Sequence, residues 1–198
     1  MHPPCLRQLL GCLFLPLLVG ISTAQPLHFN IVKGSDVIGT IVAERNVHGD
    51  GTFYSMVSNS EFSLVWSNTV QSTTATTYIN GILHSCGAFM HVNKSMRDSS
   101  NMVRIGDQAH CYIHPNKRFI HSGVVEWTTA RMYYEEPIGQ TRIFVESEMA
   151  FRRFEAIGAN IYRLHLSDGK LNEYTYRRGE LQEVKVIRTF FDLYFKRV

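Results

Sequence analysis

The chain has 198 residues, with 20 Lys and Arg against 17 Asp and Glu, and its formal net charge is +3 at pH 7. Because the charge is nearly balanced and the basic residues are scattered, the sequence argues against a nucleic-acid-binding protein. The length fits one domain large enough to bury a real core, without linkers, repeats or low-complexity runs.

The first 24 residues have the pattern of a secretory signal peptide. Arg7 supplies the positive region, an apolar run extends from Leu9 to Ile21, and the small residue Ala24 is placed for cleavage before Gln25. The run is shorter than the roughly 20 residues of a membrane-spanning helix. We therefore expect an exported protein, in the periplasm or outside the cell. Residues 25–198 would form a single β-rich domain with no membrane span.

The mature chain opens with alternating apolar and polar residues, which is typical of half-buried strands. A meander of three strands is expected over Leu27–Lys33, Val37–Asn46 and Thr52–Leu64. Gly39, inside the second of these strands, indicates a bulge or a close approach by the neighbouring backbone. Farther on, Asn80–Gly81 predicts a tight hairpin turn, because both residues accept positive φ.

The alternation continues through most of the remaining chain, with turn residues between the runs. Strands are expected over His84–Met96, Met102–Ile113, Thr141–Glu148, Ala150–Ile157, Ile161–Leu166 and Thr189–Val198. Polar or glycine-containing turns are expected at Arg97–Asn101, Ser167–Lys170 and Arg177–Glu180.

The segment Ser122–Pro137 is different, because its apolar residues do not alternate. At 3.6 residues per turn, Val124, Trp127, Ala130 and Tyr134 fall along one side, with Ser122 as N-cap and Pro137 as stop. This pattern predicts a short helix that is apolar over most of its circumference and has to be buried. An additional strand is the alternative, since Trp, Tyr and Val also suit a sheet. The predicted fold is mainly β, a single curved antiparallel sheet, or half-barrel, wrapped around one short helix.

Histidines surround the two cysteines that remain after cleavage, Cys86 and Cys111. Residues two or four apart on a strand share a face, so His84 with Cys86, and His110 with His114, are candidate Zn²⁺ ligands. Ordinary surface histidines are the alternative interpretation. In an exported protein the two cysteines form either a disulfide or a pair of buried thiols, and their spacing does not decide between these states.

Carboxylates are grouped after the predicted helix, at Glu135, Glu136, Glu146 and Glu148. Two close carboxylates can act as acid and base when their surroundings separate their pKa values. Neighbouring arginines favour the simpler interpretation of solvated ion pairs. The chain has no nucleophile elbow, phosphate loop, dinucleotide fingerprint or Cys-x-x-Cys pair. No catalytic residue and no cofactor are therefore predicted.

Aromatic residues are frequent in the second half of the chain. They either pack the core of a small β protein or line a cavity for an acyl chain or another apolar ligand. The residues predicted to contact such a ligand are Trp127, Tyr133, Tyr134, Phe144 and Tyr174.

Four stretches carry a family resemblance, namely Thr77–Leu83, Met132–Gly139, Phe144–Glu148 and Tyr162–Gly179. Together they resemble an uncharacterised domain-of-unknown-function family of exported Gram-negative proteins of the Bacteroidota type. Its general shape is similar to the half-barrels of periplasmic lipoprotein carriers, whose curved sheet holds a helix in a hollow used for acyl chains. The resemblance implies a lipid or hydrophobic-ligand binder, although no carrier residue maps onto this chain and a shared fold does not fix function.

Three functional hypotheses follow. The first is an exported, non-enzymatic binding or carrier module for a lipid-like or other apolar ligand, which requires a cavity inside the sheet. The second is a structural or protein-interaction component of the cell envelope, which requires a filled core and an exposed apolar patch. The third is a metal-assisted hydrolase, which requires His84, His110 and His114 to converge.

Overall fold

The computed structural model describes residues 22–23, 25–63 and 67–198. The predicted signal peptide therefore lies outside the described residues, except for Ser22 and Thr23. The first strands are β1 Ser22–Thr23, β2 Leu27–Lys33, β3 Asp36–His48, β4 Gly51–Ser63, β5 Ser67–Ile79, β6 Ile82–Val92, β7 Ser95–Ile105, β8 Gln108–Ile113 and β9 Lys117–Ser122. The others are β10 Arg142–Val145, β11 Ala150–Gly158, β12 Ile161–His165, β13 Leu171–Arg177, β14 Glu180–Ile187 and β15 Asp192–Arg197. Two 3-10 helices, η1 Arg131–Tyr133 and η2 Ser167–Gly169, complete the regular structure of these ranges.

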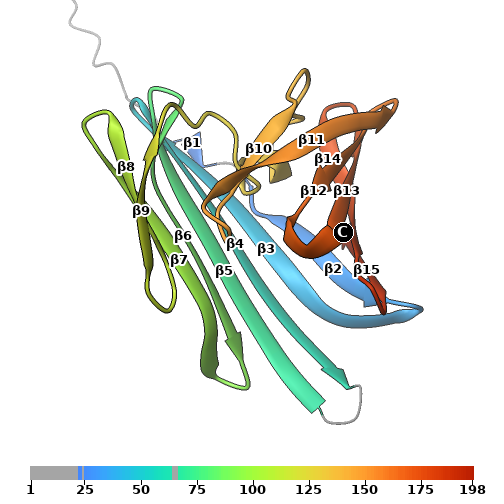
Figure 1. The fold of residues 1–198 in the computed structure, drawn as a ribbon. Coiled ribbons are helices and arrows are strands. Elements are labelled where there is room, and N and C mark those ends of the chain that lie inside the picture. The colour runs from blue at the N-terminus through green and yellow to red at the C-terminus, as the bar shows by residue number, and fades with distance from the viewer. Residues whose placement is uncertain (1–21, 24, 64–66) are drawn as a thin grey trace, which may run out of the picture.

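All of these strands belong to one antiparallel sheet, as predicted. Its order is β10-β11-β12-β13-β14-β15-β2-β3-β4-β5-β6-β7-β8-β9, with β1 paired outside this path to β3. The sheet is not closed, because β9 and β10 are its two ends. Figure 1 shows that the sheet curves, so that the long strands β3 to β7 face the shorter strands β11 to β15. The concave side of this curve is called the hollow below.

Local turn chemistry sets several of the hairpins. Asn80 and Gly81 have φ of 51° and 76° in the turn between β5 and β6, and Arg178 and Gly179 have φ of 55° and 78° between β13 and β14. Both turns were predicted, the first because Asn80 and Gly81 accept positive φ and the second from its polar, glycine-containing composition. Gly39 lies beside a register shift between β2 and β3, which confirms the bulge expected there.

The predicted turn at Arg97–Asn101 is wrong, because these residues lie inside β7. The chain turns earlier, at Asn93 and Lys94, which both have positive φ. It turns again near Gly106, so the single strand predicted over Met102–Ile113 is two strands, β7 and β8.

The predicted helix over Ser122–Pro137 is also wrong, because the structure describes no α-helix there and only the single 3-10 turn η1. Over the ranges that the structure describes, the fold is therefore a curved antiparallel sheet that wraps around no α-helix. Residues 123–141, called the inner segment below, are mostly irregular and connect the two ends of the sheet. Their apolar residues face several different neighbours, so the helical spacing does not mark one helical face.

Backbone groups of the inner segment bond to the sheet rather than within a helix. The Leu83 N–H donates to the Val125 carbonyl at 2.8 Å, and the Phe144 N–H donates to the Trp127 carbonyl at 3.0 Å. Thr128 also forms a parallel bridge with Phe144. The inner segment is thus held by β6 at one side and by β10 at the other, which satisfies backbone groups that would otherwise be buried without partners.

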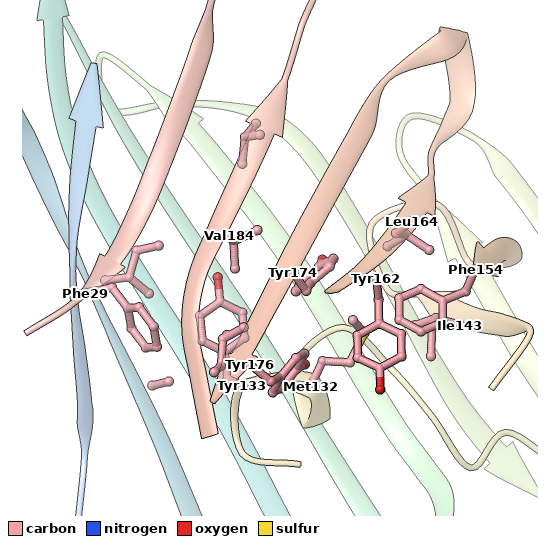
Figure 2. Close-up of a cluster of buried hydrophobic side chains, with 14 of the residues drawn as sticks. Phe29, Met132, Tyr133, Ile143, Phe154, Tyr162, Leu164, Tyr174, Tyr176 and Val184 are labelled. Carbon is pink, nitrogen blue, oxygen red and sulfur yellow. The ribbon is translucent and has the colours of Figure 1, made fainter. Parts of the chain in front are cut away.

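The core consists of two clusters that meet at the inner segment. The first cluster joins β2 and β3 to the C-terminal strands and to Met132 and Tyr133. Figure 2 shows side chains of this cluster, with Tyr133 beside Tyr176. The second cluster joins β4 to β9 with Val125 and Ala130. Strand β10 contributes to both, since Ile143 packs in the first and Phe144 in the second.

Candidate functional site

The hollow of the sheet contains a cavity of about 630 Å³. This volume falls in the range of small-molecule sites, which is roughly 300–1,000 Å³. Three parts of the molecule surround the cavity: one wall from β4 to β8, a second wall from β13 to β15, and a floor from the inner segment and the residues after β10.

Strand register places the lining residues of the β4 to β8 wall in two rows that cross the strands. The first row is Met56, Thr74, Ala88, Ser100 and Ile113. The second row is Ser72, Met90 and Asp98. Both rows mix apolar with polar side chains, so this wall offers contact area and hydrogen-bonding groups together.

The second wall presents a paired row in which Tyr174 lies opposite Val184 and Val184 lies opposite Phe195. Tyr174 is 2% exposed, and burial raises the pKa of its hydroxyl to about 12. Asn172, Lys170 and Arg188 lie at one end of this wall. The wall is therefore apolar along the strands and polar at that end.

The floor is fixed by a buried carboxylate, Glu146, which is 1% exposed. It accepts hydrogen bonds from the Thr129 hydroxyl at 2.5 Å, the Thr129 N–H at 3.2 Å and the Ala130 N–H at 2.9 Å. Burial raises the pKa of Glu146, and these hydrogen bonds oppose part of that rise. The contacts hold the start of η1 in place and thereby position Tyr133, which lines the cavity.

The second carboxylate of this region, Glu148, lines the cavity. It accepts hydrogen bonds from the Ser167 hydroxyl at 2.8 Å and the Ser167 N–H at 3.1 Å, and it is ion-paired with Arg152. Burial would raise the pKa of Glu148, but the Ser167 and Arg152 contacts outweigh it and hold the pKa below its usual value. Glu146 and Glu148 thus have different partners and pKa values shifted in opposite directions.

The other two predicted carboxylates, Glu135 and Glu136, each accept a hydrogen bond from a tyrosine hydroxyl. Glu135 is ion-paired with Arg131 at 2.6 Å and accepts a hydrogen bond from the Tyr54 hydroxyl at 2.5 Å. Glu136 accepts one from the Tyr162 hydroxyl at 2.8 Å. Each of these contacts fastens the inner segment to the sheet.

Of the five aromatic residues predicted to contact a ligand, the structure places Tyr133 and Tyr174 in the cavity lining. The other three lie elsewhere. The Arg131 guanidinium lies over the Trp127 ring, with the Arg131 Cζ atom 4.4 Å from the ring centroid. The Tyr134 hydroxyl donates to the Ala43 carbonyl at 2.8 Å. Phe144 is fully buried in the second core cluster.

The three histidines predicted as metal ligands are not brought together. His84 is exposed while Cys86 is buried, because a bulge where β5 meets β6 breaks the alternation between them. His110 is exposed on β8, and His114 follows that strand at the cavity rim. Across the described ranges, no group of three or more His, Cys, Asp and Glu side chains is arranged to hold a metal ion.

Cys86 and Cys111 are buried free thiols. Each pairs with Met102 of the intervening strand β7, so the two cysteines lie two strands apart. That separation is about 10 Å, whereas a disulfide needs Cα atoms about 4.4–6.8 Å apart. Burial raises the pKa of both thiols.

The prediction missed the lining of the β4 to β8 wall. Thr74, Ala88 and Ser100 are small or polar and gave no apolar alternation to mark an inward face. One signal was available, because Tyr78 is a large aromatic residue on β5 and is expected to face the core. Alternate residues of a strand share a face, so Thr74 and Ser72 lie on the same face as Tyr78. Assigning the inner face of β5 from Tyr78 would have identified these two residues.

The chain is similar to one protein family and to a solved structure. A protein-family model described as "Domain of unknown function (DUF6134)" matches residues 29–198. The fold is similar to the crystal structure of a beta-barrel-like protein of domain of unknown function DUF1849 from Brucella abortus, with a TM-score of 0.52 and 13% sequence identity. That match covers 87% of this chain and 95% of the other, and at this identity it shows the fold alone. No curated protein matches the chain.

Proposed function

The chain belongs to the DUF6134 family, and because the description of that family assigns no activity, we propose from the geometry of the hollow that the protein is a non-enzymatic binding module for a lipid-like or other apolar small molecule. The observation that carries the proposal is the cavity of about 630 Å³ between the two walls. A filled core would leave no such volume.

The lining suits a ligand that is largely apolar. Met56, Ala88 and Ile113 from one wall and Val184 and Phe195 from the other present aliphatic and aromatic surface to the same space. Removing apolar surface from water stabilises a complex by roughly 25 cal/mol per Å². The polar groups among them would orient the ligand, as in other small-molecule sites.

The inner segment gives the cavity a rigid floor. It is fixed by backbone bonds to β6 and β10 and by the buried Glu146, and Tyr133 projects from it into the lining. A preformed site loses less conformational entropy on binding than one that has to be ordered by the ligand. These contacts support binding without a large rearrangement of the sheet.

The binding test uses the neutral fluorescent probe N-phenylnaphthylamine. We expect saturable, equimolar binding to the wild-type protein and a loss of about tenfold or more in affinity for Ala88→Trp, whose side chain would occupy cavity space. Ala75→Trp is the matched control, because Ala75 neighbours Gly87 on β6 and does not line the cavity. Urea unfolding of both variants would establish that they are folded.

Absent or non-saturable probe binding would overturn the proposal. Equal loss of affinity in Ala88→Trp and Ala75→Trp would overturn it as well, because the loss would then not depend on the cavity.

Export is the second part of the proposal and rests on the leader pattern of residues 1–24. We expect the protein to accumulate outside the cytoplasm with a mature N-terminus at Gln25. Fractionation followed by mass spectrometry of the N-terminal peptide measures both. A cytoplasmic protein that retains Met1 would contradict it. No helix among the residues described is long and apolar enough to cross a membrane.

A further inference from the structure

Arg188 lines the cavity and has no carboxylate partner among the described residues. Its Nη1 donates to the Leu171 carbonyl at 3.0 Å, to Asn172 Oδ1 at 3.1 Å and to the Ile187 carbonyl at 2.8 Å. All three acceptors are neutral. The guanidinium is thus fixed in position by Nη1, and no acceptor from the described part of the chain is bonded to Nε or Nη2.

Burial of this side chain lowers its pKa, as expected for a cation partly removed from water without a countercharge. An arginine nevertheless stays protonated at physiological pH. A half-buried cation that faces a cavity is an electrostatic cost to the empty protein, and an anion placed beside it would offset that cost.

The other charged groups that line the cavity are either ion-paired or exposed to water. Glu148 is ion-paired with Arg152, and Lys170 lies 3.5 Å from Asp168. Asp98 is exposed on β7, across the cavity from Arg188, so water screens its charge. Arg188 is therefore the half-buried charge of the described lining that lacks an opposite partner.

The position of Arg188 matches the polarity of its wall. It follows β14 and bonds to the start of β13, so it lies at the end of the wall that also holds Lys170 and Asn172. Farther along the same strands the lining is Tyr174, Val184 and Phe195. The wall therefore presents a cationic end followed by an apolar surface.

We propose that the ligand is an amphiphile with a carboxylate or phosphate head group bound by Arg188 and an apolar tail that lies against Val184 and Phe195. The free Nε and Nη2 atoms form the planar pair of donors with which arginine binds carboxylate and phosphate in a bidentate manner. This inference rests on the proposed binding function and names the class of ligand for the same cavity.

The test measures displacement of N-phenylnaphthylamine from the full-length chain by three compounds with the same tail: dodecanoate, dodecanol and dodecylamine. We expect dodecanoate to bind about tenfold to one-hundredfold more tightly than dodecanol, which is the range for a hydrogen bond to a charged group. Arg188→Gln should remove this preference, so that dodecanoate no longer binds more tightly than dodecanol. Arg188→Lys retains part of it, because the charge remains but the bidentate geometry does not.

Arg177→Gln is the matched control, because Arg177 is an exposed arginine at the far end of β13 that does not line the cavity. This variant should keep the full preference for dodecanoate. Urea unfolding midpoints of the variants separate a loss of ligand selectivity from a loss of folding.

The outcomes distinguish this inference from the proposed function. If all three compounds displace the probe equally, or if Arg188→Gln keeps the preference, the cavity binds apolar ligands but the head-group assignment is wrong. Preferential displacement by dodecylamine would also overturn it and would point to Asp98. If none of the compounds displaces the probe and the probe itself does not bind, the binding function fails.

A second arm identifies the source of the amphiphile. The protein is incubated with vesicles of phosphatidylglycerol or of phosphatidylcholine and then separated from them. Phosphatidylglycerol that remains with the wild-type protein and not with Arg188→Gln supports a membrane lipid as the source. Dodecanoate binding without lipid uptake supports a free single-chain amphiphile. Uptake of both lipids regardless of Arg188 contradicts the assignment.

Discussion

The Glu146 carboxylate accepts a hydrogen bond from the Ala130 N–H at 2.9 Å, and this contact joins the chain after β10 to the floor of the hollow. The same side chain accepts two bonds from Thr129. Glu146→Ala would leave these buried donors without an acceptor, so we expect the free energy of unfolding to fall by about 2–4 kcal/mol. Urea denaturation measures the change. Glu126→Ala, at an exposed position of the inner segment, should cost less than about 0.5 kcal/mol.

Glu146 also predicts a pH dependence. Because burial raises its pKa above the ordinary value of 4.5, the native state binds the proton more tightly than the unfolded chain does. Its contribution to stability is therefore fully present below pH 4.5 and declines as the pH rises through the raised native pKa. The stability difference between wild type and Glu146→Gln should shrink as the pH rises. A difference that grows with pH would contradict the assignment.

Glu135, which lies in the inner segment, has a pKa shifted in the opposite direction. Burial would raise its pKa, but hydrogen bonds from Tyr54 and Arg131 outweigh it and lower the pKa below 4.5. Its contribution is present above pH 4.5 and is lost as the pH falls through the lowered native pKa. The difference between wild type and Glu135→Gln should therefore shrink toward acid pH. Measuring both variants in one titration of urea midpoints controls for general acid denaturation.

Gly39 lies at a position in the sheet where we expect any side chain to destabilise the fold. A Cβ at this residue would lie 2.2 Å from the Asn59 carbonyl oxygen and 2.6 Å from the Ser60 Cα, both backbone atoms of β4. Gly39→Ala should lower the free energy of unfolding by about 1–3 kcal/mol, because strands have to shift to accept the methyl group. The control is Gly158→Ala, whose Cβ would make only ordinary contacts with Ile161 at 3.5 Å or more. Equal unfolding midpoints for the two variants would refute the close approach.

We expect the thiols of Cys86 and Cys111 to react slowly in the folded protein. Cys86 and Cys111 are both buried, and burial raises their pKa, which lowers the fraction of reactive thiolate. We expect iodoacetamide to label both at least about a hundredfold more slowly in buffer than in urea. Peptide mass spectrometry identifies which of the two residues is labelled. Rapid labelling of either residue in buffer would show that its strand opens readily.

The sequence predicted the sheet well where structure depends on neighbouring residues. Asn80, Gly81 and Gly179 accept positive φ, so the sequence located the two hairpins that contain them. The inner segment was misread because its apolar spacing depends on distant partners. Val125 meets residues of β6 and Met132 meets C-terminal strands, and no local pattern reports such contacts.

The same limit explains the errors around the cavity. Ser99, Ser100 and Asn101 were taken as a turn because they are polar, but Ser100 faces inward on β7. Alternation identifies an inner face only when that face is packed with apolar side chains. A face that borders a partly polar cavity lacks this signature. Arg188 was overlooked for a related reason, because the sequence does not show that the described residues around it include no carboxylate partner.

The two-sided burial of β10 has a consequence for how the protein unfolds. Ile143 belongs to one core cluster and Phe144, the next residue, to the other. Neither half of the sheet can therefore be opened without removing part of the packing of the other half. The N-terminal and C-terminal halves should behave as one cooperative unit, with coincident transitions for probes placed in each half.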